Sequence, residues 1–129
     1  MANTFHEIGV ALQIGTCSDA IEVGPNSRWL FSSGTPGLRT DGVLPQDIVG
    51  QTEETWKNID LILASAGMTY KDLVQVTTYL IREEDRQVYA KTRAKILDGH
   101  KPAFMLVIVP GLVRDDMLLE VQFVAAKTA

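Results

Sequence analysis

Residues 101–126 read KPAFMLVIVPGLVRDDMLLEVQFVAA, two apolar runs that are joined by a short polar turn. The first run, residues 103–109, is continuously apolar and lies between two prolines. Such a run is typical of a β-strand that is covered on both faces. We therefore expect it to be a central strand of the sheet around which the chain folds.

The second run, residues 117–124, has the composition of a strand but carries a carboxylate. Glu120 and Gln122 lie two positions apart, so their side chains point to the same face, and that face is partly polar. Two interpretations of Glu120 remain open. In the first, the face meets solvent and Glu120 is an ordinary polar surface residue. In the second, the face lines a cleft, where desolvation raises the pKa of the carboxyl group and prepares it to hold or pass a proton.

The overall composition is that of one ordinary globular domain. The chain has 129 residues, of which 46% are hydrophobic and 22% charged, so we expect a single domain over residues 1–129. Its net charge of −4, without a cluster of Lys or Arg, argues against nucleic acid as a partner. The N-terminus lacks a basic segment before an apolar core, and no apolar run reaches the length of a membrane span. We therefore expect no membrane contact and a cytoplasmic location.

The sequence offers few residues that could bind a metal. The single cysteine, Cys17, excludes an intrachain disulfide and a cysteine-based zinc site. His6 and His100 supply too few ligands for a structural metal. We expect the protein to bind none.

Three short strands are predicted in the first third of the chain, over residues 8–14, 20–23 and 29–32. Residues 24–27 form a turn between the last two, which predicts a meander or hairpin. Glycines and prolines then predict a long loop over residues 34–42, and binding residues are commonly carried on such loops.

The apolar period changes between residues 45 and 66, where inward residues fall three or four positions apart. This stripe consists of Ile48, Thr52, Trp56, Ile59, Leu63 and Ala66. It predicts a helix with Pro45 in its first turn and Gly67 at its C-terminal end. Trp56 is expected to be a core residue.

A strand–helix–strand unit is predicted next. Residues 73–81 are rich in Val, Thr and Tyr, and the acidic residues 83–85 begin a second helix, where they complement its dipole. The expected inner stripe of this helix consists of Val88, Thr92 and Ile96. Because the strand at residues 103–109 follows the helix, the two strands of the unit should be parallel.

Together these elements predict an α+β domain with a mixed sheet of five or six strands and two helices on one face. Two helices cover only one face of such a sheet. The other face still carries apolar residues of both C-terminal runs, so oligomerisation is the natural way to bury it.

The usual catalytic signatures are absent from the sequence. It contains no phosphate-binding glycine loop, no GxSxG or HExxH sequence, and too few histidines for a triad. The sequence Ser32-Ser33-Gly34 follows a predicted strand and could bind a ligand through backbone N–H groups, although a plain turn has the same composition.

Several short segments occur in a familiar order. They are Ile14-Gly15, Ser33-Gly34, Gln51 and Asn58 on the first helix, Ala66-Gly67 at its end, and Pro102-Ala103 before Glu120. In this order and spacing the chain resembles the reactive intermediate deaminase A (RidA, YjgF) family over nearly its full length. The resemblance implies a chorismate-mutase-like fold and a homotrimer with three clefts between subunits. It also implies hydrolysis of 2-enamines or 2-imines to 2-keto acids and ammonia, without a metal or cofactor.

Three positions depart from the pattern of that family. The family has an arginine directly after the Pro-Ala dipeptide, where it holds the substrate carboxylate, and this chain has Phe104. A tyrosine two residues after Ile-Gly corresponds to Cys17, and an asparagine at the start of the second helix corresponds to Tyr89. The resemblance makes all three substrate-contacting positions.

Three other positions keep the pattern. Ser33 and Gly34 correspond to substrate-binding residues, and Glu120 corresponds to the catalytic glutamate if one residue is inserted in the turn at residues 111–116.

Replacing a guanidinium by a phenyl ring removes a charge-assisted pair worth about 1.5–3 kcal/mol. Simple 2-imino acids should then bind poorly, and the apolar pocket wall favours a less charged or aromatic ligand. Alternatively, Phe104 only fills space at a subunit interface. Cys17 has the same two interpretations, a small buried hydrophobe or a ligand-contacting or nucleophilic group at the cleft rim.

Two classes of function remain open. The first is a divergent deaminase in which Glu120 positions water for attack on a C=N bond, with Ser33 and the Gly34 N–H orienting the substrate. The second is a non-catalytic trimer that binds a small molecule or a partner protein.

Overall fold

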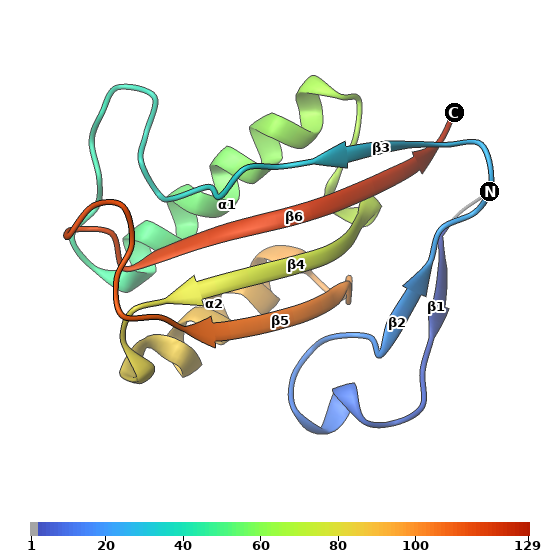
Figure 1. The fold of residues 1–129 in the computed structure, drawn as a ribbon, viewed down its shortest axis with the longest axis horizontal. Helices are drawn as coiled ribbons and strands as arrows, with labels where there is room; N and C mark the ends of the chain where they lie inside the picture. Colours follow the sequence, from blue (N-terminus) through green and yellow to red (C-terminus); the bar gives the residue numbers. More distant parts are fainter. Residues whose placement is uncertain (1–2) are drawn as a thin grey trace.

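The structure is a computed structural model and describes residues 3–129. A four-stranded sheet and two helices form two layers, and a separate two-stranded ribbon lies beside one end of the sheet (Figure 1). The strands are β1 (Thr4–His6), β2 (Ala20–Glu22), β3 (Ser27–Phe31), β4 (Leu73–Leu80), β5 (Ala103–Ile108) and β6 (Leu119–Thr128). The helices are α1 (Ile48–Ser65) and α2 (Arg86–Leu97), with short 3-10 turns at η1 (Ala11–Gln13), η2 (Tyr70–Asp72) and η3 (Glu83–Asp85).

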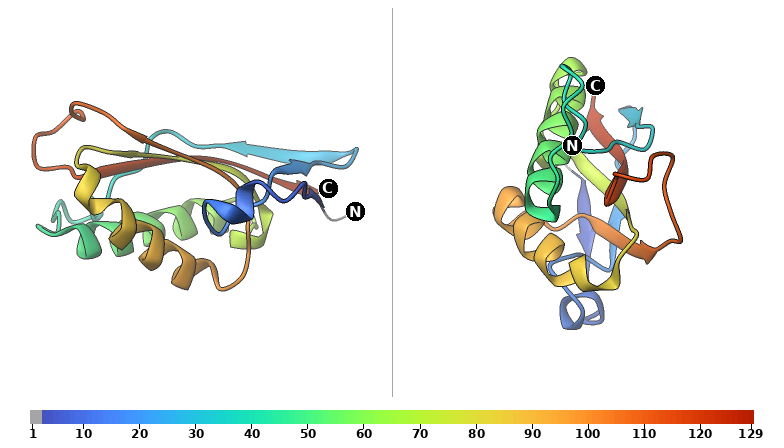
Figure 2. Two further views of the ribbon diagram at one scale, coloured as in Figure 1. Left: turned by 90° about the horizontal axis from the view of Figure 1, so that it is seen from below. Right: turned by 90° about the vertical axis from the view of Figure 1, so that its left-hand side faces the viewer.

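The strands of the large sheet lie in the order β3-β6-β4-β5. β4 and β5 are parallel and are connected through α2, which confirms the predicted strand–helix–strand unit. β6 is antiparallel to β4 and to β3. Both helices pack on the same face of the sheet, as predicted (Figure 2). The predicted single sheet of five or six strands is wrong, because β1 and β2 form a sheet of their own.

The helix α1 supplies most of the core on the covered face of the sheet. Its residues Trp56, Ile59 and Leu63 are fully buried and pack in one cluster with inward residues of β4 and β6. The helix begins after Asp47, whose side chain accepts a hydrogen bond from the Gly50 N–H at 3.3 Å. Pro45 therefore precedes the helix instead of lying in its first turn.

The C-terminal end of α1 requires a glycine. Gly67 has a φ of +70°, and the following Met68 N–H donates to the carbonyl of Leu63 at 2.9 Å. This left-handed residue and its hydrogen bond close the last turn of the helix, as the sequence predicted.

The inner stripe predicted for α2 is wrong by one position. The buried residues are Tyr89, Arg93 and Leu97, whereas Val88 is exposed. Tyr89 and Arg93 carry polar groups, so a search for apolar periodicity overlooks them. Asp85, four residues before Tyr89, is also buried and accepts two hydrogen bonds from Arg82, at 2.7 and 3.0 Å, so the same spacing extends to the start of the helix.

The prediction that residues 103–109 form a central strand is also wrong. β5 is an edge strand, and β4 and β6 occupy the centre. The side chains of Phe104 and Leu106 pack toward the core, while Met105 on the opposite face is 60% exposed. A continuous apolar run indicates two apolar faces, but one of these faces is uncovered in the single chain.

The N-terminal third differs most from the sequence prediction. Residues 8–14 contain the turn η1 instead of a strand, because the carboxylate of Asp19 accepts hydrogen bonds from the N–H groups of Ile8, Gly9 and Ala11. These bonds hold the backbone in a compact loop. The predicted hairpin is wrong as well, since β2 pairs with β1 and β3 pairs with β6.

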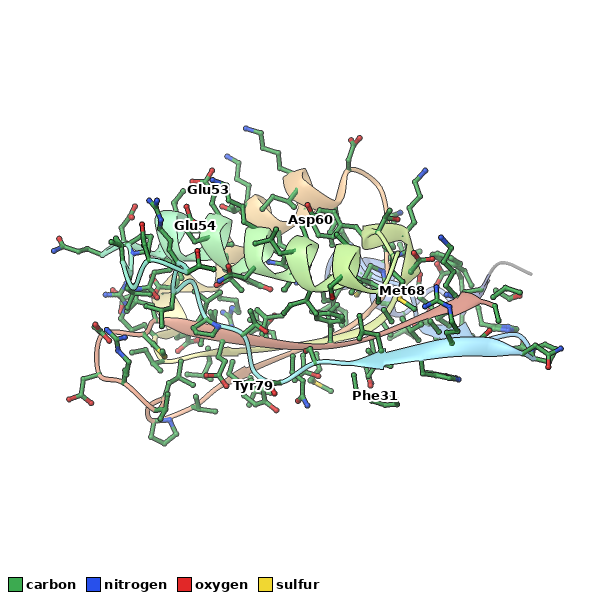
Figure 3. All side chains as sticks on the ribbon, turned by 90° about the horizontal axis from the view of Figure 1, so that it is seen from above. Phe31, Glu53, Glu54, Asp60, Met68 and Tyr79 are labelled. Atoms are coloured by element: carbon green, nitrogen blue, oxygen red, sulfur yellow. The ribbon has the colours of Figure 1, made fainter. Side chains whose placement is uncertain are left out.

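The sheet face opposite the helices, hereafter the open face, carries exposed apolar side chains. Trp29 and Phe31 of β3 stack with ring centroids 6.2 Å apart, and Phe31 is 71% exposed. Figure 3 shows Phe31 and Tyr79 on this side, away from Glu53 on α1. Within residues 3–129, none of the helices combines the length and apolarity that crossing a bilayer requires.

Candidate functional site

Glu120 lies near the middle of the open face. It lies on β6 directly opposite Tyr79 of β4. Its neighbours in sequence, Leu119 and Val121, are buried and point to the helix side, so Glu120 points to the open face. The side chain is partly exposed. It makes no hydrogen bond or ion pair with any of residues 3–129, so the carboxylate is available to a ligand or a water molecule.

The segment after β3 brings Ser33 and Gly34 beside this carboxylate. Thr35 exchanges two backbone hydrogen bonds with Val121, at 2.7 and 3.0 Å, so the segment continues along β6. The Cα of Gly34 lies so close to Glu120 that an added Cβ would overlap the carboxylate. A residue larger than glycine at position 34 would displace the Glu120 side chain, and Ser33 beside Gly34 is exposed. We call Ser33, Gly34 and Glu120 the Glu120 patch.

The other predicted site residues lie on the helix side of the sheet. Phe104 pairs with buried Val76 across β4 and β5, and its ring faces α2. The loop that carries Cys17 is held at the same end of β5, because the Ser18 hydroxyl donates to the carbonyl of Lys101 at 2.5 Å. Cys17 is half-buried, and its Sγ lies 3.7 Å from the carbonyl oxygen of Ala11.

Tyr89 is completely buried between the helices and the sheet. Its hydroxyl shares a hydrogen bond of 2.5 Å with the hydroxyl of Thr78, and burial raises the pKa of the phenol above its usual value. In this chain the side chain acts as a packing residue, and its direct contact with a ligand stays a prediction.

Sequence reasoning missed Arg93, which lies among these residues. Its guanidinium carbon is 3.8 Å from the centroid of the Phe104 ring and 5.6 Å from that of Tyr89. The side chain is only 6% exposed. Four-residue spacing from Tyr89 to Leu97 would have placed Arg93 on the inner face, had the tyrosine been recognised as the inward residue. We call Cys17, Tyr89, Arg93 and Phe104 the Arg93 cluster.

The structure thus divides the predicted site residues into two groups on opposite faces of one sheet. The Glu120 patch offers an anion on the open face, and the Arg93 cluster offers a cation near the edge strand β5 on the helix face. A single chain does not bring the two groups together. Among the described residues, no group of three or more His, Cys, Asp and Glu side chains is arranged to hold a metal ion.

A hollow of about 830 Å³ lies elsewhere, between the N-terminal ribbon and the end of α2. Its lining includes Phe5, Tyr70 and His100. Burial raises the pKa of Tyr70 to about 12 and lowers that of His100. None of the predicted site residues lines this hollow, so its size does not make it the candidate site.

Comparisons with known proteins agree with this architecture. A family model described as Endoribonuclease L-PSP matches residues 10–127. A RutC family protein of Pyrococcus horikoshii is 33% identical over 116 residues, which cover 88% of this chain and 89% of that protein. TdcF of Escherichia coli, a candidate reactive intermediate deaminase, is 24% identical over 120 residues, or 90% of each chain.

Solved structures show the same fold. A protein of the Rid family from Yersinia pestis superposes with a TM-score of 0.84 at 24% identity, over 98% of this chain and 100% of that one. TdcF of Escherichia coli, solved with bound serine, gives 0.73 at 23% identity over 81% and 90% of the two chains. The fold defines a small α+β protein of the chorismate-mutase-like class. Together with the family model, it shows that this chain belongs to the RidA/YjgF family.

Proposed function

We propose that this protein is a RidA-type enamine/imine deaminase with altered substrate specificity, and that it acts in the cytoplasm as a homotrimer without a cofactor. The observation that carries the proposal is the unpaired Glu120 carboxylate packed against Gly34 on an otherwise partly apolar face. Family membership supports the reaction class, and a single domain over residues 1–129 is part of the proposal.

The proposed reaction adds water across a C=N bond. Glu120 accepts a proton from a water molecule as the oxygen attacks the imine carbon, and the Gly34 N–H and Ser33 hydroxyl hold the substrate. Transfer of protons to the nitrogen then releases ammonia and leaves a carbonyl compound. One imine and one water give one carbonyl compound and one ammonia, so no oxidant or reductant is consumed.

The trimer is proposed because one chain leaves both groups incomplete. Exposed Trp29, Phe31 and Met105 on the open face need a cover. If the edge of one copy meets the open face of the next, the Arg93 cluster approaches the Glu120 patch of its neighbour, and three such contacts close a ring. Sedimentation equilibrium should give a trimer at micromolar concentration, and a stable monomer would contradict this part of the proposal.

The activity can be tested by generating imines from several amino acids with an imine-releasing enzyme and measuring ammonia. We expect the protein to accelerate ammonia release and Glu120→Gln to abolish the acceleration. A chelator should leave the rate unchanged, because the proposed site uses no metal.

A second candidate, a non-catalytic trimer that binds a small molecule or a partner protein, is favoured by Phe104. This residue replaces the arginine that the family uses and faces α2 instead of the open face. If no imine is turned over and ligand binding survives in Glu120→Gln, the binding protein is the better description.

A further inference from the structure

Arg93 is a buried cation without a matching anion. Its side chain is 94% removed from solvent, and none of the ion pairs within residues 3–129 includes it. The Nε has no hydrogen-bond partner. A hydrogen bond runs from Nη2 to the Oγ1 of Thr16, at 3.5 Å, the limit for such a bond, and the Tyr89 hydroxyl is a second neutral polar partner of the guanidinium, which acts to lower the pKa of that phenol.

Burial of an arginine in this state is costly. A guanidinium has five N–H donors and is charged at every physiological pH, so it is normally buried only with carboxylates or several acceptors. The Phe104 ring offsets part of this cost by a cation–π contact with one face of the guanidinium, whose Cζ lies 3.8 Å from the ring centroid. The Tyr89 ring contributes less, because its centroid is 5.6 Å away. The Thr16 and Tyr89 hydroxyls are neutral acceptors and leave the positive charge uncompensated, and the Nε–H has no acceptor. The guanidinium therefore still lacks an anion.

The guanidinium also lies close to the surface. Thr16, whose hydroxyl accepts the hydrogen bond from Arg93 Nη2, is exposed, and the next residue, Cys17, is half-buried. Ser18 fixes this loop to the start of β5, so the exposed Thr16, the guanidinium and the Phe104 ring lie together at one edge of the sheet. An anion that binds Arg93 would approach beside Thr16, and because Arg93 is only 6% exposed and its Nε is fully buried, the loop that carries Thr16 must shift to admit it.

We propose that Arg93 is the anion-binding residue of this protein, and that it takes the carboxylate of a small organic acid, with the Phe104 ring as the platform that orients the guanidinium. This proposal rests on the proposed deaminase for the reaction, but not for the binding. It replaces the expectation of a less charged ligand, because the phenyl ring at position 104 carries a cation on its face. The family's arginine would lie at position 104 on β5, whereas Arg93 lies on α2. A carboxylate would therefore be held from a different direction, which is a physical reason for altered specificity.

The binding test titrates pyruvate and its neutral amide, pyruvamide, into the unmodified protein, because neither compound has a C=N bond and no turnover interferes. Isothermal calorimetry should show pyruvate binding about tenfold or more tightly than pyruvamide. Arg93→Met keeps the length and apolar stem of the side chain and should remove this preference. Arg93→Lys keeps the charge without the planar fork and should fall between the two.

Arg86→Met is the matched control. It makes the same chemical change two turns earlier on α2, at an exposed arginine whose ion pair with Glu83 is long, at 3.6 Å. The preference for pyruvate should survive in this variant. If Arg93→Met binds pyruvate as the parent protein does, or if it weakens both ligands equally, Arg93 has only a packing role and the proposal is wrong.

The proposal remains testable if Arg93→Met does not fold. A parent protein without preference for pyruvate over pyruvamide overturns it directly. Phe104→Leu, which removes the platform and keeps an apolar side chain, should reduce the preference as well. Imine turnover without that preference would overturn the role of Arg93 alone, while the preference without any turnover would overturn the deaminase alone.

Discussion

The Glu120 patch and the Arg93 cluster lie on two faces of the same sheet and differ in how complete each is within one chain. Glu120 is partly exposed and has no hydrogen-bonding partner within residues 3–129, and its carboxylate lies directly against Gly34. Arg93 is buried against the rings of Phe104 and Tyr89, and its polar partners, Thr16 and Tyr89, are neutral. This difference matches the proposed roles, in which the carboxylate acts on water and the guanidinium holds an anion.

The difference also separates chemistry from specificity. Substitutions in the Glu120 patch should change the rate with little effect on folding, because the carboxylate contributes no internal bond. Substitutions in the Arg93 cluster should change both ligand preference and stability, because this cluster is part of the core between α2 and β5.

The largest expected effect comes from Glu120→Gln. Loss of the proton acceptor should lower kcat for imine hydrolysis by about 100-fold to 10,000-fold, with the melting temperature nearly unchanged. Ammonia release and thermal unfolding measure the two quantities. Glu53→Gln makes the same change on the helix side of the molecule (Figure 3) and should leave the rate as it is. A rate that survives in Glu120→Gln would remove Glu120 from the mechanism.

The second effect is that of Phe104→Arg. From the sequence, this change either rebuilds a carboxylate clamp or buries an unpaired charge. Because Phe104 faces α2 and carries the Arg93 guanidinium on its ring, the new guanidinium would meet a like charge. We expect a loss of about 3 kcal/mol in the free energy of unfolding, with weakened assembly. Denaturant unfolding and sedimentation test this, with Phe104→Leu as the apolar control. An intact trimer with raised imino-acid turnover would contradict it.

Secondary structure could be predicted from the sequence where the apolar residues follow a single helical or strand period. Five residues of the predicted stripe are buried in α1, the sixth, Ala66, caps its C-terminal end, and the alternation in β6 placed Glu120 and Gln122 on one face. The order of strands could not be predicted, because hydrogen-bonding partners far apart in sequence leave no local trace. β5 and β6 look alike as apolar runs, but one is at the edge and the other in the centre.

The candidate site, too, could be predicted only in part. Ser33, Gly34 and Glu120 were expected together, and the structure brings them together. The family resemblance makes Phe104 a substrate-contacting position, and this stays a prediction because the implied clefts lie between subunits. Within one chain Phe104 lies on the face opposite Glu120, and its neighbour Met105 points to the open face. Arg93 escaped because the sequence shows a charged residue on a helix, and such residues usually face water.

The third prediction is a smaller effect on stability in the Glu120 patch. Gly34→Ala introduces a Cβ that overlaps the Glu120 carboxylate, so the side chain or the Ser33–Thr35 segment must move. We expect a loss of only about 0.5 kcal/mol in unfolding free energy, because the group in the way is the end of a flexible, partly exposed side chain, and a lower kcat because the carboxylate is displaced. Gly15→Ala, where an added Cβ meets nothing within 4 Å, is the control. Equal losses in both variants would show that the contact with Glu120 is not the cause.

The smallest effect concerns the loop that carries Cys17, and it comes from Asp19→Asn or from acid. The Asp19 carboxylate accepts backbone hydrogen bonds at 2.7 Å from Ile8, 3.2 Å from Gly9 and 2.8 Å from Ala11. These bonds, the one from Ile8 foremost, lower the pKa of the carboxyl group below its ordinary value of 3.8.

Because the folded pKa is the lower one, the stabilisation of the loop is complete above the unfolded pKa and is lost as the pH falls through the folded pKa. The Ala11 amide should therefore be protected from hydrogen exchange near neutral pH. Its protection factor should fall only in acid, where the loop opens more often. Asp19→Asn should produce the same opening at neutral pH. Thr35 beside the Glu120 patch bonds to β6 and should keep its protection in the variant, since its hydrogen bond at 2.7 Å is independent of the loop. Equal loss of protection at both amides would mean that the two regions open as one unit, and the separation between patch and cluster would not hold in solution.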